Sequence, residues 1–460
     1  MGMAGAVSDR AEGNRAYLLF ICLVASLGGL LFGFDTAVIS GTEPLFTREY
    51  ALGAKMEGFV TSSAIIGCFL GAWLAGALTD AFGRKRVLLL SAALFVVSSL
   101  WCWLTRTAAE LVWARLVGGL GIGIASLTSP LYIADVSPPR SRGRLVALQQ
   151  LAIVLGILGA FFSNTLVGGL TLDEPAKWRL MFLVAVVPAG LFLALILPLP
   201  ESPRWLTKQG REQEACAILT RLAGARDAQA GMAQIRDALA HEGATLGELF
   251  RPGVRRALCV GTGLAVFTQV TGINAIMYYA PKVFTEAGFG TAAAYWCGVW
   301  VGLTNLVFTL ASMAVVDYLG RRSLLLIGAT CMGVALLFVG YGFHAKLSGP
   351  ALLGGVLAYV GSFAFSMGVV GWVVISEIYP TRIRGRAMAV ATAAVWGACY
   401  LVSVTFPGLL AWVGSSATFW TYAAMCVGAI LFVWWLVPET KGRSLEDIDR
   451  TWLASGSANG

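Results

Sequence analysis

Two charged residues, Asp35 and Arg115, lie inside long apolar stretches of the sequence. A charge within a membrane-spanning segment is costly, and such residues usually serve an ion pathway. At ~1.5 Å per residue, each lies roughly 8 to 9 Å from the same expected end of its segment, so the side chains can pair. While Arg115 faces it, Asp35 stays ionised; when Arg115 moves away, desolvation favours uptake of a proton. The pair predicts a proton-coupling switch, with a static structural ion pair as the alternative.

Amide side chains within apolar stretches are the second candidate set. Amides can both donate and accept hydrogen bonds, so several of them together can bind a ligand rich in hydroxyl groups. The candidates are Gln150, Gln269, Asn274 and Asn305. Tyr278 follows Asn274 by one helical turn on the same face, and Gly272 is expected to loosen this helix. Each amide taken singly fits an interhelical hydrogen bond equally well, whereas the set together favours a ligand site.

Acidic and arginine residues recur in two copies about 240 residues apart, as expected of a transporter built from repeated halves. The motif at residues 80–85 reads DAFGRK and that at 317–322 reads DYLGRR. The motif at 200–204 reads PESPR and that at 438–443 reads PETKGR. We expect these acids and arginines to pair between neighbouring helices at the cytoplasmic side and to latch one state of a carrier. The set comprises Asp80, Arg84, Asp135, Arg142 and Glu201 in the first copy, and Asp317, Arg321, Glu377, Arg384 and Glu439 in the second.

The elements that must position these residues are membrane helices. The chain of 460 residues is 57% hydrophobic and only 13% charged, which is typical of a protein whose solvent is the bilayer. The apolar runs predict twelve spans, at about 17–41, 57–79, 87–105, 110–134, 145–169, 179–199, 257–281, 293–316, 324–343, 352–376, 387–411 and 417–437. The sequence therefore predicts an all-α membrane protein made of two pseudo-symmetric six-helix halves.

The domain organisation follows from these spans. We expect a first half at residues 1–200, a cytoplasmic helical linker at 201–256, a second half at 257–438 and a cytoplasmic tail at 439–460. Amphipathic stretches at 212–222 and 233–239 predict short helices in the linker. Lys and Arg concentrate in the even-numbered connections and both tails, so the positive-inside rule puts both termini in the cytoplasm. The same distribution accounts for the net charge of +8 without any affinity for nucleic acid.

Several function classes are disfavoured by what the sequence lacks. Nine cysteines without CxxC spacing and only two histidines argue against a disulfide framework or a metal site. No nucleotide-binding loop of the GxxxxGK[ST] type is present, and no nucleophile, base and orienting residue assemble in any segment. We therefore expect no cofactor and no enzymatic activity.

The motifs together resemble the sugar porter family of the major facilitator superfamily. They are GGLLFGFDTAVISG at residues 28–41, PESPRW at 200–205, GIN at 272–274 with two tyrosines at 278–279, and PETKGR at 438–443. The sequence is similar to bacterial proton-coupled xylose symporters and to animal facilitative glucose transporters. The resemblance implies the major facilitator fold, alternating access and a hexose or pentose as substrate.

The resemblance also implies roles for particular residues. Proton symporters of the family carry Asp at position 35, whereas the animal facilitators carry Asn. The four candidate amides match sugar-binding positions of the family, as do Trp372 and Trp396, while Phe32 and Phe363 are expected to close the cavity from either side. The sequence departs from the polar residues of the family at Ile157, Thr268, Val395 and Cys399. Each lost hydrogen bond to the sugar is worth about 1 kcal/mol, so the family's D-glucose or D-xylose specificity is in doubt here.

Three functions stay open at this stage: a proton–sugar symporter, an uncoupled facilitative uniporter, and a sugar sensor on the same fold. Asp35 favours the symporter. We expect a monomer, with a monosaccharide, the proton and the lipid bilayer as its partners. The short termini and short external loops favour a plasma membrane location, the inner membrane if the source is bacterial.

Overall fold

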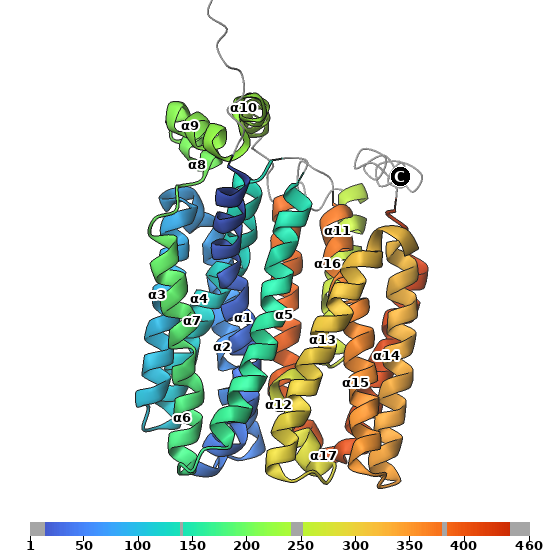
Figure 1. Ribbon diagram of the computed structural model, residues 1–460. Helices are drawn as coiled ribbons and strands as arrows, with labels where there is room; N and C mark the ends of the chain where they lie inside the picture. The colour runs from blue at the N-terminus through green and yellow to red at the C-terminus, as the bar shows by residue number, and fades with distance from the viewer. Residues whose placement is uncertain (1–13, 139–140, 241–251, 380–383, 442–460) are drawn as a thin grey trace, which may run out of the picture.

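The computed structural model describes residues 14–138, 141–240, 252–379 and 384–441. In the first half the helices are α1 (Arg15–Glu49), α2 (Ala54–Phe82), α3 (Arg84–Leu104), α4 (Ala108–Val136), α5 (Arg142–Gly168), α6 (Glu174–Val184) and α7 (Val186–Ile196). In the second half they are α11 (Pro252–Val270), α12 (Ile273–Glu286), α13 (Thr291–Leu319), α14 (Arg321–His344), α15 (Gly349–Phe365), α16 (Val370–Glu377) and α17 (Arg384–Leu436). These helices stand side by side in one upright bundle (Figure 1).

Twelve membrane crossings follow from these helices. Eleven segments of the described chain are long and apolar enough to span a bilayer, and the last of them, 385–436, has 52 residues, enough for two crossings at ~1.5 Å per residue. It bends at Gly414, whose φ of 78° and ψ of 170° are not helical. The expected spans 387–411 and 417–437 lie on either side of this bend. The prediction of an all-α bundle with twelve spans is confirmed.

Three of the crossings are interrupted helices. The sixth is divided into α6 and α7 at Ala185, the seventh into α11 and α12 at Gly272, and the tenth into α15 and α16 after Ser366. Interrupted helices in a membrane protein are tolerated where the freed backbone groups line a cavity or are buried in protein. The interruption at Gly272 agrees with the expectation of a loosened helix, whereas that after Ser366 was not predicted.

Three short helices lie outside the bundle at one end (Figure 1). They are α8 (Pro203–Lys208), α9 (Glu212–Ala223) and α10 (Ala225–Ala240), and they pack through a small apolar core of Trp205, Leu206, Ala215, Leu219, Ala228 and Met232. The backbone N–H of Asn14, which precedes α1, donates to the carbonyl of Arg221 in α9 at 3.0 Å. We call this end of the bundle the linker end and the opposite end the far end. Helix α1 begins at the linker end, and α17 also ends there (Figure 1).

Many large apolar side chains on the outside of the bundle are exposed. Trp412 is 85% exposed, Trp73 76% and Val187 73%. A soluble protein rarely presents so many, whereas a bundle surrounded by lipid tails needs an apolar outer surface. The exposed surface therefore fits a bilayer as the surrounding medium.

Glycines allow α2 and α4 to cross at very short distance. A Cβ atom on Gly119 of α4 would lie 1.9 Å from the carbonyl oxygen of Ala64 in α2, and one on Gly67 of α2 would lie 2.2 Å from the carbonyl oxygen of Leu116. Four residues further along each helix, Gly123 and Gly71 make equally close approaches. Small residues spaced by four are the usual means by which membrane helices approach each other.

We expect Gly119→Val to prevent normal packing of the first half. The atoms that obstruct the new side chain belong to the backbone of α2, so the cost should exceed the ~1–3 kcal/mol of ordinary overpacking. The thermal midpoint of the purified protein should fall by several degrees, or the variant should not yield monodisperse protein. Gly76→Val in α2 is the matched control, because no atom lies within 4 Å of its Cβ position. Equal stability of the two variants would contradict the close crossing.

Candidate functional site

The side chains of Asp35 and Arg115 form a direct ion pair in the first half. Arg115 Nη1 donates to Asp35 Oδ1 at 2.5 Å, and the two side chains are 4% and 18% exposed. Helix α4 begins at Ala108 because Thr107 accepts from the backbone N–H of Glu110 while the Glu110 carboxylate accepts from the backbone N–H of Arg106. This cap places Arg115 two turns into α4.

The surroundings of the ion pair are largely apolar. The Arg115 guanidinium lies 5.5 Å from the centroid of the Phe182 ring, and its Nε has no hydrogen-bond partner among the described residues. Asp35 also borders a small cavity between α1, α3 and the α6–α7 junction, lined by Leu31, Phe34, Asp35, Val38, Phe95, Ser98, Ser99, Cys102, Phe182 and Ala185. In such surroundings each charge depends on the other, since an unpaired buried charge is strongly unfavourable.

The break between α11 and α12 brings two of the candidate amides together. Gly272 has φ 97° and ψ 13°, and a Cβ atom there would lie 2.6 Å from the Tyr422 ring, so glycine is required on both counts. Across the break, Asn274 Nδ2 donates to Gln269 Oε1 at 2.5 Å and also to the Cys399 sulfur at 3.2 Å. The Tyr278 hydroxyl lies 3.9 Å from the same sulfur. Cys399 thus takes part in the amide cluster.

One aromatic contact joins the two halves near this cluster. The Phe32 ring of α1 lies 5.5 Å from the Trp396 ring of α17 at an interplanar angle of 55°. Trp396 is buried, and its indole N–H has no partner among the described residues. A buried indole N–H normally has an acceptor, so this donor is available to a ligand or a water molecule.

The remaining sugar-site candidates are not linked to this cluster by a described hydrogen bond or ring contact. Asn305 is buried and accepts from Thr309 at 3.5 Å, Gln150 and Phe363 are half-buried, and Trp372 is 37% exposed. Gln149, which was not predicted as a site residue, is buried and lies against Gly29 of α1. Both polar atoms of its amide lack a hydrogen-bond partner in the described part of the chain. The available signal was that Gln149, like Gln150, is an amide within an apolar stretch.

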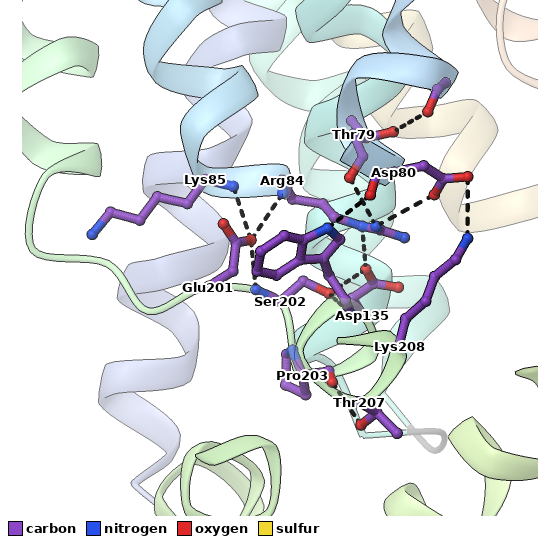
Figure 2. Close-up of polar contacts among 12 residues, drawn as sticks. Thr79, Asp80, Arg84, Lys85, Asp135, Glu201, Ser202, Pro203, Thr207 and Lys208 are labelled. Atoms are coloured by element: carbon purple, nitrogen blue, oxygen red, sulfur yellow. Dashed lines mark hydrogen bonds and ion pairs between the residues drawn. The ribbon is translucent and has the colours of Figure 1, made fainter. Parts of the chain in front are cut away.

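At the linker end of the first half, one cluster joins α3, α4 and the segment 201–202 before α8 (Figure 2). Arg84 Nε donates to Asp135 Oδ2 at 2.9 Å, and Ser202 Oγ donates to the same oxygen at 2.6 Å. Glu201 accepts from the backbone N–H groups of Arg84 and Lys85 at 2.8 and 3.0 Å. The first turn of α3 has unsatisfied N–H groups that attract an acid, which explains the position of Glu201.

The second half repeats this cluster with equivalent residues. Arg321 Nη2 donates to Glu377 Oε1 at 3.1 Å, and Thr440 Oγ1 donates to Glu377 Oε2 at 2.6 Å. Glu439 accepts from the backbone N–H groups of Arg321 and Arg322 at 2.9 and 3.1 Å. The repeated sequence motifs therefore correspond to repeated contacts, and each cluster stays within its own half.

The other predicted gating residues take different positions. Asp80 lies 3.8 Å from Arg84 and 3.3 Å from Lys208, with 58% of its side chain exposed (Figure 2). Arg142 is exposed and forms no ion pair with a described residue. Arg142 therefore does not pair with Asp135, whose partner is Arg84. The side chains of Asp317 and Arg384 lie outside the described part of the structure.

Glu439 has a pKa below its ordinary value of 4.5. Burial alone would raise this pKa, but backbone N–H groups of Lys441, Arg321, Arg322 and Thr440 donate to the carboxylate and outweigh burial. The carboxylate therefore stabilises the fold at every pH above about 4.5, and this contribution is lost as the pH falls through the lowered pKa.

We expect Glu439→Gln to lower the stability of the second half by about 1 kcal/mol at pH 7, a value reduced for partial exposure to solvent. The thermal midpoint measured against wild type should show this difference at pH 7 and lose it progressively below about pH 4.5. Lys346→Met, an exposed residue at the far end, serves as the control. A difference that grew on acidification would contradict this account.

At the far end the two halves are joined by contacts that were not predicted from the sequence. Lys282 of α12 contacts Glu57 Oε1 of α2 directly and lies 4.0 Å from Glu43 Oε1 of α1. The Tyr295 hydroxyl of α13 donates to the Gly41 carbonyl at 2.9 Å. Among the described residues no ion pair joins the halves at the linker end. The structure thus represents a state in which the two halves are closed against each other at the far end.

Two similar six-helix halves around interrupted helices, with a buried acid–arginine pair, define a multi-pass membrane transporter of the major facilitator fold. A family model described as "Sugar (and other) transporter" matches residues 21–452. The chain belongs to this family of transporters, which are not enzymes.

Relatives of known function cover nearly the whole chain. It is 39% identical over 445 residues to the arabinose-proton symporter of Bacillus subtilis, covering 96% of each chain. It is also 39% identical over 474 residues to the D-xylose-proton symporter of Escherichia coli, covering 95% of this chain and 96% of the relative. The inward-open structure of the E. coli xylose transporter XylE matches with a TM-score of 0.85 and 36% identity, covering 95% of this chain and 100% of that one.

Proposed function

We propose that this protein is a proton-coupled symporter that moves a monosaccharide, a pentose or a hexose, by alternating access. The observation that carries the proposal is the direct Asp35–Arg115 pair within an apolar environment. Relatives that are symporters of arabinose and of D-xylose with protons support it.

Coupling follows from the charge balance of the pair. With Arg115 in place, Asp35 is held as a carboxylate. When a change of state separates the two, Asp35 is left in apolar surroundings and binds a proton more readily than it bears an unpaired charge. The proton then travels with the sugar and leaves when Arg115 returns.

The sugar site is proposed to lie where the halves meet. Gln269 and Asn274 supply hydrogen bonds from the broken seventh crossing, Tyr278 extends this face by one turn, and Phe32 and Trp396 provide aromatic surfaces from opposite halves. The further candidates Gln150, Asn305, Phe363 and Trp372 complete the set. Ligand recognition through amides and aromatic faces suits a polyhydroxylated ring with apolar C–H surfaces.

The two halves, residues 1–200 and 257–438, are proposed to rock against each other, with 201–256 as the linker and 439–460 as the tail. The linker-end clusters around Arg84 and Arg321 act as gating elements that hold each half together. Asp80, Asp135, Glu201, Glu377 and Glu439 belong to these clusters. Gating roles for Arg142, Asp317 and Arg384 stay predictions from the sequence. The distribution of Lys and Arg supports a cytoplasmic linker end with both termini inside a plasma membrane, the inner membrane in a bacterium. We propose that the monomer is the transporting unit.

Uptake by vesicles containing the purified protein tests the function and identifies the substrate. Labelled pentoses and hexoses are supplied outside, with and without an inward proton gradient. Accumulation of one sugar above its external concentration only with the gradient supports the symporter. Equilibration of the sugar that does not depend on the proton gradient would instead establish a uniporter. Uptake of no sugar would favour a sensor.

A further inference from the structure

Three ionisable side chains at the far end join the two halves, and the coupling pair does not use them. Glu43 of α1 and Glu57 of α2 come from the first half, and Lys282 of α12 comes from the second. The glutamate side chains are only 2% and 5% exposed, and that of the lysine is 27% exposed. Two carboxylates of one half thus converge on one ammonium group of the other.

The charges of this cluster do not balance. One ammonium group can neutralise only one of the two carboxylates, and Lys282 contacts Glu57 directly. Glu43 Oε1 accepts from Thr47 at 3.4 Å, whereas Oε2 is buried without a hydrogen-bond partner among the described residues. A buried and unpaired carboxylate is strongly unfavourable.

The groups around Glu43 do not supply the missing charge. Tyr279 of α12 donates its hydroxyl to the Ser403 carbonyl, and Tyr295 of α13 donates to the Gly41 carbonyl. On α1 itself, Arg48 pairs with Glu174 at 2.8 Å and Glu49 pairs with Arg179 at 2.8 Å. Helix α17 packs against α2 but has no ionisable side chain other than tyrosine and cysteine between residues 387 and 436.

We propose that the cluster of Glu43, Glu57 and Lys282 binds one proton when the two halves close at the far end and releases it to the same side when they part. A proton on Glu43 Oε2 removes the unpaired negative charge and leaves one carboxylate facing one ammonium group. Closure at the far end is therefore promoted by acid on that side. This proton does not cross the membrane, so the site is distinct from Asp35 and extends the proposed function.

The expected size of the effect follows from proton linkage. If closure takes up one proton, the ratio of closed to open molecules changes by up to tenfold per pH unit, provided that the pH lies between the affinities of the two states. Glu43→Gln or Glu57→Gln should remove the dependence and keep the far end closed, because one carboxylate and one ammonium remain. Lys282→Met should favour the open state.

Pulsed electron spin resonance between labels on the two halves measures the closed fraction directly. The labels are attached at Lys55→Cys in α2 and Ala411→Cys in α17, both exposed positions. Cys216, Cys259 and Cys331, which are not buried, are replaced by serine. Every variant also carries Asp35→Asn, so that the coupling site does not contribute to the pH dependence. Failure of the sugar-symport proposal would leave this distance measurement unaffected.

The proposal predicts that the short inter-label distance loses population from pH 5 to pH 8 in the parent protein and stays populated in Glu43→Gln. Glu57→Gln provides the same test should Glu43→Gln not fold. Glu174→Gln is the matched control, since it removes a carboxylate of the same end whose ion pair stays within the first half, and it should titrate like the parent. A parent without pH dependence, or an equal pH dependence in Glu43→Gln and Glu174→Gln, would overturn the proposal.

Discussion

The Asp35→Asn variant should lose all gradient-driven accumulation of sugar. With one proton per sugar, an inward gradient of two pH units supports roughly a 100-fold accumulation in wild type, because each tenfold concentration ratio corresponds to ~1.4 kcal/mol. An amide cannot take up or release this proton, so the accumulation ratio of the variant should fall to about one. The measurement is the steady-state ratio of internal to external labelled sugar in vesicles.

Exchange of sugar across the membrane should survive in the same variant. Asparagine still accepts a hydrogen bond from Arg115, and the change of state without a proton remains possible, so exchange of labelled for unlabelled sugar should stay within about threefold of wild type. Asp227→Asn, an exposed residue of α10, is the matched control and should accumulate sugar normally. Uphill accumulation by Asp35→Asn would show that this carboxylate is only structural.

The Asn274→Ala variant should bind sugar roughly 10 to 100 times more weakly. The change removes a proposed hydrogen bond to the sugar and also leaves Gln269 Oε1 without its donor at 2.5 Å. Losing one bond and leaving one buried polar group unsatisfied costs about 1 to 3 kcal/mol. The dissociation constant of the transported sugar, measured with purified protein by calorimetry, tests this prediction.

A second buried asparagine provides the control for Asn274. Asn164 of α5 donates to the backbone carbonyls of Ala37 and Val38 in α1 at 3.3 and 3.2 Å and thus has a structural role. Asn164→Ala should lower the thermal midpoint but leave the dissociation constant within about twofold of wild type. Equal loss of affinity in both variants would mean that Asn274 acts through helix packing and not through the ligand.

Much of the architecture was predictable because hydropathy and repetition act on long stretches of chain. The twelve spans were found, and the repeated motifs correspond to equivalent clusters around Arg84 and Arg321. Helix ends were less accurate: α1 was expected to end near residue 41 but continues to Glu49. The helical pattern persists through Pro44 into a polar segment that hydropathy assigns to a loop.

Contacts between distant segments were the least predictable part. Glu43 lies beyond the expected span 17–41, and Lys282 lies directly after the expected span 257–281. That they converge with Glu57 depends on how the second half sits against the first. The pairing of Asp35 with Arg115 was foreseen because a buried charge demands a partner and few were available. Arg142 is exposed to solvent and does not need a partner of opposite charge.

Proton movement driven by sugar alone is the most direct test of coupling. Vesicles containing the protein and an internal pH-sensitive dye are prepared with equal pH and no membrane potential on both sides, and the transported sugar is added outside. The account predicts acidification of the interior as the sugar enters, and none in Asp35→Asn. Entry of labelled sugar into wild-type vesicles without any acidification would contradict proton symport.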